Sequence, residues 1–145
     1  MKIYISSTQK DLEAYRARVA QVLRQIDHTV LYMEDYTAEE SRPLDRCIEH
    51  GASAELYIGI FAWRYGYVPE ENTGPGELPE GVTVGETSIT EAEYHAAAKA
   101  KIPRLIFLLA ETEPWPPGFM DSHTGEGDGG RRIKNLRGLL GERHM

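Results

Sequence analysis

Four short runs of the chain are apolar without the polar alternation that marks a strand with one face in water. They lie at Lys2–Ser6, Thr29–Met33, Leu56–Ala62 and Pro103–Leu109. Strands of this kind are typical of a parallel sheet that helices cover on both faces. The pattern therefore predicts four buried strands. Gly59 lies inside the central one, where the missing side chain allows a helix or a ligand to approach the backbone closely.

The segments between these runs carry apolar residues at helical spacing. The first helix is expected to begin at Ser7 or Thr8, with Asp11 in capping-box position. Its expected buried stripe is Leu12, Tyr15, Val19, Val22, Leu23 and Ile26, and its expected wet face is Glu13, Arg16, Arg18 and Arg24. Further helices are predicted from Pro43 to Ile48, over Ile89–Ala100, and in a C-terminal helix and tail over 131–145. The basic run in the last segment, Arg131, Arg132, Lys134 and Arg137, is expected on a solvated face.

The alternation of strands and helices predicts an α/β fold, a flavodoxin-like three-layer sandwich whose short parallel sheet has the strand order 2-1-3-4. The first and third strands are then central neighbours. Ligands bind beyond the carboxyl ends of such strands, at the point where the strand order reverses. Ser6-Ser7-Thr8 and Trp63-Arg64-Tyr65-Gly66 converge there, and Asp35 leaves the second strand at the same edge. The sequence therefore places a candidate site at this edge.

Two hypotheses fit the aromatic end of the third strand. Aromatic rings beside an arginine suit an anionic, aromatic ligand, with Trp63 or Tyr65 against its ring and Arg64 against its charge. In the alternative, the two aromatic side chains cap the core and Arg64 pairs with a nearby acid. The residues alone leave both hypotheses open.

The helix after the third strand carries two acids near its beginning. Ser88-x-x-Glu91 and Thr90-x-x-Glu93 both match the capping box, so one acid is expected to be structural. With Ser88 as the cap, Glu91 is its reciprocal partner and Glu93 lies free in the second turn, where the helix dipole favours the ionised form. An ionised carboxylate beside a ribose would stabilise an oxocarbenium-like centre. The alternative, which spacing alone favours, is a solvated acid on an exposed face.

Composition narrows the classes of function. The chain of 145 residues is expected to form one domain, and 41% hydrophobic and 27% charged residues are ordinary for a globular protein. A net charge of −7 argues against binding a nucleic-acid backbone. The lone Cys47, the lack of a signal peptide after Met1 and the lack of a membrane-length apolar run predict a cytoplasmic protein without a membrane partner. The histidines are scattered, so no metal site is predicted, although Cys47 and His50 have the spacing of half a site.

Two long loops are rich in Pro, Gly and acidic residues. The first, Pro69–Glu86, is predicted to be a binding loop that is mobile without ligand, because it has few apolar anchors and many like charges. The second, Glu113–Gly130, precedes the last helix.

Several of these motifs, taken together and in this order, resemble the DUF4062 family over Lys2 to about Leu109. They are Ile5-Ser6-Ser7-Thr8 with Asp11-Leu12, Met33-Glu34-Asp35-Tyr36, Arg42-Pro43-Leu44, Ile58-Gly59-Ile60 with Trp63-Arg64-Tyr65-Gly66-Tyr67-Val68-Pro69, and Ser88-Ile89-Thr90-Glu91-x-Glu93-Tyr94. The resemblance implies a TIR-like domain at the N-terminus of a larger protein with STAND-type NTPase or repeat modules. Residues 1–145 are accordingly expected to be one such domain of a longer chain.

Relatives of that family imply a role for one acid. TIR domains carry a glutamate in the helix after the third strand, and Glu93-Tyr94-His95-Ala96-Ala97 has its spacing. Nucleoside deoxyribosyltransferase-like proteins carry a Thr-x-x-Glu, which Thr90 and Glu93 match. Both resemblances imply that Glu93, rather than Glu91, is the acid nearest the C1′–N bond between the ribose and the base of a bound nucleotide. The chain departs from TIR domains at Ile89-Thr90, where they usually carry a Trp-Cys pair. It is also expected either to lack their fifth strand or to end before it.

The leading expectation is an enzyme that cleaves the nicotinamide–ribose bond of NAD or an equivalent N-glycosidic bond, in signalling or defence, with NAD as substrate and no cofactor. Glu93 is the expected catalytic residue, and the expected substrate-binding residues are Ser6, Ser7, Thr8, Asp35, Trp63, Arg64, Tyr65, Gly66 and Thr90. The first alternative is a catalytically silent interaction domain that signals by self-association or with TIR-like domains. The second is a sensor that binds a nucleotide without reacting with it.

Overall fold

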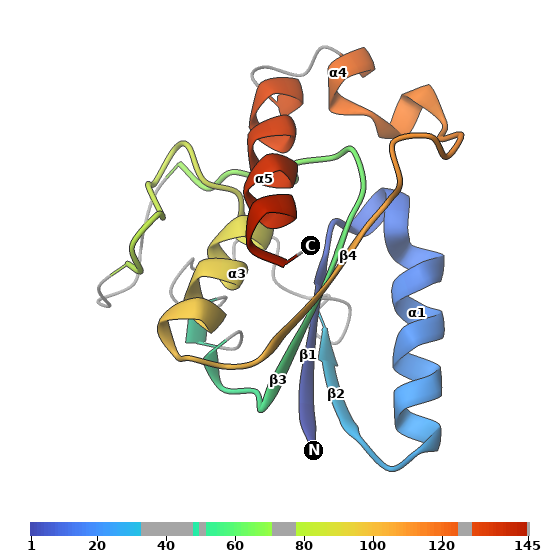
Figure 1. Cartoon of the computed structure of the whole chain (residues 1–145), viewed down its shortest axis with the longest axis vertical. Helices are drawn as coiled ribbons and strands as arrows, with labels where there is room; N and C mark the ends of the chain where they lie inside the picture. The colour runs from blue at the N-terminus through green and yellow to red at the C-terminus, as the bar shows by residue number, and fades with distance from the viewer. Residues whose placement is uncertain (33–47, 50–51, 71–77, 125–128, 145) are drawn as a thin grey trace.

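The computed structural model describes residues 1–32, 48–49, 52–70, 78–124 and 129–144 (Figure 1). The elements are β1 (Lys2–Ser7), α1 (Gln9–Gln25), β2 (Thr29–Tyr32), β3 (Leu56–Phe61), α3 (Ile89–Lys99), β4 (Arg104–Leu108), η2 (Pro117–Phe119), α4 (Asp121–Thr124) and α5 (Gly129–His144). They follow the predicted alternation of strands and helices. Most of the helix predicted from Pro43, and part of the loop Pro69–Glu86, lie outside the described residues.

The four strands form one parallel sheet in the order β2-β1-β3-β4, as predicted. In the central pair, Ile3 lies opposite Leu56 and Ser6 lies opposite Gly59. The carboxyl ends of β1 and β3 therefore meet at one edge of the sheet. The fold belongs to the α/β class and is consistent with a flavodoxin-like layered architecture.

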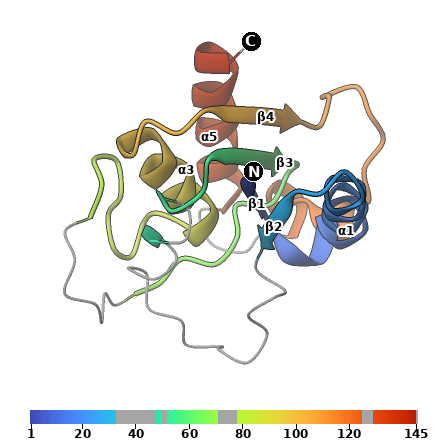
Figure 2. The same cartoon turned by 90° about the horizontal axis from the view of Figure 1, so that it is seen from below.

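Helices lie on both faces of the sheet (Figures 1 and 2). Because successive side chains of a strand point to opposite faces, β1 divides its apolar residues between two cores. On one face Ile3 and Ile5 pack with Ala20 of α1. On the other face Tyr4 packs in a cluster with residues of α3 and α5. This division explains why the strands lack polar alternation.

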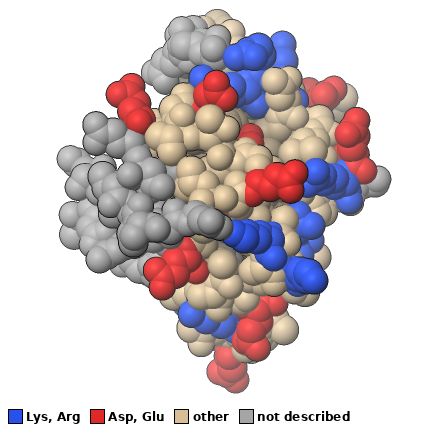
Figure 3. Space-filling model, turned by 90° about the vertical axis from the view of Figure 1, so that its left-hand side faces the viewer, with Lys and Arg blue, Asp and Glu red and all other residues tan. Residues whose placement is uncertain are grey.

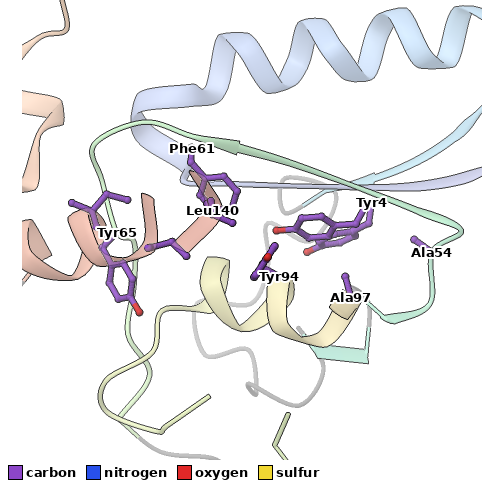
Figure 4. Close-up of a cluster of buried hydrophobic side chains, with 10 residues drawn as sticks. Tyr4, Ala54, Phe61, Tyr65, Tyr94, Ala97 and Leu140 are labelled. Carbon is purple, nitrogen blue, oxygen red and sulfur yellow. The ribbon is translucent and has the colours of Figure 1, made fainter. Parts of the chain in front are cut away.

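Three of the four tyrosines in the core cluster against α3 and α5 contact one another through their rings, and Figure 4 labels two of them, Tyr4 and Tyr94. The rings of Tyr4 and Tyr57 stack with centroids 6.4 Å apart, and Tyr57 meets Tyr94 of α3 edge to face at 6.3 Å. Gly59 leaves space for the aromatic side chains on this face of the sheet, because a Cβ there would lie 2.5 Å from Cε2 of Phe61. The close approach predicted at Gly59 is thus made by a neighbouring aromatic ring.

The stripe predicted for α1 is partly wrong. Arg16, expected in water, is fully buried, whereas Tyr15, Val22 and Ile26 are 54%, 43% and 60% exposed. The helix faces the sheet through Leu12, Arg16 and Ala20, which are four residues apart. Apolar residues outside this stripe point away from the sheet. The apolar pattern was broader than the face that the sheet covers.

The expectation of a buried fourth strand is also wrong, because the exposure of β4 alternates. Leu105 and Phe107 are 50% and 57% exposed. They pair with Ile58 and Ile60 of β3, on the sheet face where α1 packs, but β4 lies at the edge of the described sheet, beyond that helix.

The described part of the loop Pro69–Glu86 has more apolar anchors than predicted. Val82 is buried against Ile89 and Ala92 of α3, and Leu78 and Val84 pack against the same cluster. No helix among the described residues is long and apolar enough to cross a membrane.

Candidate functional site

The carboxyl ends of β1 and β3 bring three of the predicted site residues together. A Cβ built on Gly66 would lie 3.2 Å from Cγ2 of Thr8 and 3.3 Å from Oγ1 of Thr90. Gly66 has a φ of +93°, a region that favours glycine. The turn after β3 therefore closes tightly over the end of β1 and the beginning of α3, as the topology predicted.

Ser7 and Thr8 face α1 and are bound to it. Arg16 donates from Nη1 to Oγ of Ser7 at 2.8 Å and to the carbonyl oxygen of Thr8 at 3.0 Å. Thr8 is the N-cap position of α1, but its hydroxyl donates to Oδ1 of Asp11 at 2.5 Å and does not cap a backbone N–H. Burial raises the pKa of Asp11, opposed by the Thr8 hydrogen bond and by the charge of Arg64. Arg16 is a site residue that the sequence pattern assigned to solvent.

Ser6 faces the opposite side, toward α3, because it alternates with Ser7 along the strand. Burial raises the pKa of the Tyr57 hydroxyl, and hydrogen bonding with the Ser6 side chain opposes this shift. Oε2 of Glu93 is buried without a hydrogen-bond partner among the described residues. Buried polar groups are nearly always paired, so this oxygen is an exception that needs an explanation.

Glu93 is the most unusual of these groups. Its side chain is 1% exposed, so the expectation of a solvated acid is wrong for this residue. Burial raises the pKa of Glu93 well above its ordinary value, because the charged carboxylate loses its hydration. This effect of burial opposes the helix dipole, which favours the ionised form.

Glu91, two residues earlier, belongs to a hydrogen-bond network. Ser88 is the cap of α3, as predicted, and its Oγ accepts from the backbone N–H of Glu91 at 3.2 Å. The other half of the capping box runs through Tyr65, whose hydroxyl accepts from the N–H of Ser88 at 3.2 Å and donates to Oε1 of Glu91 at 2.9 Å. Oε2 of Glu91 lies 3.0 Å from Nε2 of His95. Glu91 is thus the structural acid, although not by direct contact with the N–H of the cap.

Tyr65 fits the core-capping alternative. It is 4% exposed and lies in the core cluster with Phe61 and Leu140 (Figure 4). Burial raises the pKa of Tyr65 to about 12. Its backbone N–H donates to Oδ2 of Asp121 at 2.7 Å, which ties the beginning of α4 to the end of β3.

The side chain of Arg137, which was expected on a solvated face, covers one face of the Trp63 ring. The guanidinium of Arg137 lies 4.0 Å from the centroid of the Trp63 ring, and it donates to the carbonyl oxygen of Ala62 at 3.0 Å. Arg137 is 9% exposed, so its assignment to a solvated face is wrong. Arg137 and Asp121, like Arg16, are buried at this edge and were not predicted there from the sequence. A charged residue in a polar segment carries no signal that distinguishes a buried position from its solvated neighbours.

Arg64 is half-buried at the same edge, and its Nε is buried without a hydrogen-bond partner in the described part of the chain.

Asp35 lies outside the described residues, as do Cys47 and His50. No group of three or more His, Cys, Asp or Glu residues within the described ranges has an arrangement that would hold a metal ion. On the face in Figure 3, the visible basic side chains are interspersed with acidic ones.

These features define an α/β domain with a cluster of buried polar groups at the point where its strand order reverses. The chain belongs to the family DUF4062, a domain of unknown function, whose family model matches residues 2–143. The resemblance seen in the sequence motifs is confirmed over nearly the whole chain. No curated protein and no solved structure matches it.

Proposed function

We propose that this domain is TIR-like and binds NAD or a related nucleotide at the carboxyl ends of β1 and β3, and that it cleaves the bond between base and ribose. The observation that carries the proposal is Glu93, a fully buried carboxyl group with one oxygen unpartnered among the described residues. A buried acid with a strongly perturbed pKa is a recognised mark of a functional site. A signalling or defence role is the biological context that the family resemblance suggests.

A buried unpaired group is costly to keep. Leaving a buried donor or acceptor without a partner costs about 1–3 kcal/mol, and more for a charged group. An apolar residue at position 93 would avoid that cost. Retaining a carboxyl group there is reasonable if a ligand completes its interactions.

A cationic base is the ligand that such a carboxyl group suits. A positive nicotinamide ring beside Glu93 would favour the carboxylate and lower its pKa on binding. When the C1′–N bond breaks, its electron pair goes to the ring nitrogen and nicotinamide leaves as a neutral molecule, so no general acid is required. The carboxylate then stabilises the positive charge that develops on the ribose, and water adds at C1′ while losing a proton.

Other residues at this edge have polar groups that suit the rest of a nucleotide. Nε of Arg64 would donate to a phosphate, and the hydroxyl of Ser6 would bind a ribose or phosphate oxygen. Trp63 has one face covered by Arg137, so a stacked base would use its other face. Ser7, Thr8 and Tyr65 instead position the site, because their side chains are bound within the protein.

Incubation of the purified domain with NAD, at low concentration and under crowding, tests this proposal by chromatography of the products. We expect nicotinamide and ADP-ribose in equal amounts. The absence of nicotinamide release under both conditions, with NAD recovered intact, would contradict the enzymatic proposal.

The second candidate is a catalytically silent domain that acts by self-association. The observation that favours it is the exposed apolar pair Leu105 and Phe107 on the edge strand β4. Exposed apolar groups gathered on one element mark interaction surfaces more often than scattered ones do.

A further inference from the structure

The outer edge of β4 has backbone groups that the described sheet does not use. The N–H of Tyr57 donates to the carbonyl oxygen of Pro103, and the N–H of Leu109 donates to that of Phe61. Alternate residues of a strand direct their backbone groups to opposite sides, so Pro103 and Leu109 face β3. The N–H and C=O groups of Arg104, Ile106 and Leu108 therefore point away from β3, along the outer edge.

One face of the same strand is apolar and exposed. Leu105 and Phe107 project on the side where α1 packs, but α1 lies over β1 and β2 and leaves β4 uncovered at the far margin (Figure 2). On the opposite face, α5 contacts β4, and Ile106 and Leu108 pack against the core. β4 has five residues. An unpaired strand edge is a template for another strand, and proteins normally protect such edges with charge, proline or a covering segment.

The charges on either side of β4 are opposite in sign. Lys99 and Lys101 are exposed before the strand, and Glu111 and Glu113 are exposed after it. A second strand of the same sequence would therefore meet opposite charges if it ran antiparallel, and like charges if it ran parallel. Like charges placed directly across an interface are strongly unfavourable.

We propose that two copies of this chain associate by antiparallel pairing of their β4 strands, around a two-fold axis at Ile106. In this register the outward-facing residues form the hydrogen-bonded pairs, with Ile106 opposite the partner's Ile106 and Arg104 opposite the partner's Leu108. Leu105 falls opposite the partner's Phe107 in a non-hydrogen-bonded pair, where side chains approach most closely.

The flanking charges fit the antiparallel direction. Lys101, shortly before β4, comes near the partner's Glu111, shortly after its β4, whereas Lys99 is the last residue of α3 and takes no part in the strand register. The pairing joins two four-stranded sheets into one continuous sheet and covers both exposed apolar side chains with their counterparts. The inference does not depend on cleavage of NAD, because β4 carries none of the residues assigned to that site.

Sedimentation over a wide range of protein concentration tests the proposal on the whole chain. We expect a monomer–dimer equilibrium for the wild type. Phe107→Lys should weaken the dimer by about tenfold or more, because it replaces a central apolar contact with a charge. Ile26→Lys is the matched control, since Ile26 is 60% exposed but lies at the end of α1, and it should leave the equilibrium unchanged.

A charge exchange tests the direction of pairing. Lys101→Glu should weaken the dimer at low salt, and the double variant Lys101→Glu with Glu111→Lys should restore it. Thermal melting of each variant separates lost association from lost folding. A wild type that stays monomeric, or a dimer that Phe107→Lys and Lys101→Glu leave intact, would overturn the proposal. Amide protection of Arg104, Ile106 and Leu108 in a monomer would mean that another segment covers the edge, which would also overturn it.

Discussion

Glu91 and Glu93 lie two residues apart on α3, yet their surroundings are opposite. Both oxygens of Glu91 have partners, the hydroxyl of Tyr65 and the ring of His95, and its side chain keeps some access to solvent. Glu93 is fully buried, and one of its oxygens has no partner in the described part of the chain. Residues two apart on a helix point to different faces, so one faces the loop network and the other the sheet. The difference teaches that a satisfied acid holds the structure, and under the proposed function the unsatisfied one meets the ligand.

The largest expected effect is on catalysis at Glu93. Under the proposed function, Glu93→Gln keeps the shape of the side chain but removes the charge that stabilises the ribosyl cation. We expect the rate of nicotinamide release to fall by about a hundredfold or more, equivalent to about 2.7–4 kcal/mol in the barrier. Steady-state kinetics with NAD measures the loss, and Glu91→Gln is the matched control with nearly full activity. Loss of activity in Glu91→Gln but not in Glu93→Gln would reverse the two assignments.

The next largest expected effect is on stability, and it concerns the hydrogen-bond network of Glu91. Tyr65→Phe removes the hydroxyl that joins the N–H of Ser88 to the carboxylate of Glu91. We expect a loss of about 1–3 kcal/mol in the free energy of unfolding, because buried partners are left unsatisfied. Denaturant titration measures it. If Tyr65→Phe were as stable as the wild type, the network would not hold the helix in place.

A smaller effect is expected in the pH dependence of stability. Because the pKa of Glu93 is raised in the folded state, the native protein binds more protons than the unfolded chain once the pH exceeds the ordinary glutamate value of about 4.3. The free energy of unfolding should therefore fall as the pH rises from that value to the raised pKa. Glu93→Gln should lack this component, while the contribution of Asp11, whose pKa is also raised, remains in both proteins. Parallel stability curves for the two proteins would contradict the raised pKa.

Much of the fold was predictable from local pattern. The four apolar runs, their parallel pairing and the order β2-β1-β3-β4 follow from continuous hydrophobicity and from the handedness of crossovers. The exposure of Leu105 and Phe107 was not predictable in this way, because a run of apolar residues does not reveal that α1 stops short of the edge strand.

The site was predictable in its location but not in its electrostatics. Topology brought Thr8, Gly66 and Thr90 together, and Ser88 was recognisable as a cap. The burial of Arg16, Arg137 and Glu93 was not evident, since charged residues at helical positions are usually solvated. For Arg137, the carbonyl oxygens and the aromatic ring that it contacts lie far away in the sequence.

Titration of the Glu93 carboxyl group by carbon NMR, with and without NAD, tests the central claim most directly. Glu91→Gln and Glu93→Gln provide the assignment of the two signals. The account predicts that the pKa of Glu93 lies well above 4.5 in the free protein and falls when NAD binds, as a cationic ring favours the carboxylate. A Glu93 that titrates near its ordinary value, or whose pKa NAD leaves unchanged, would contradict it.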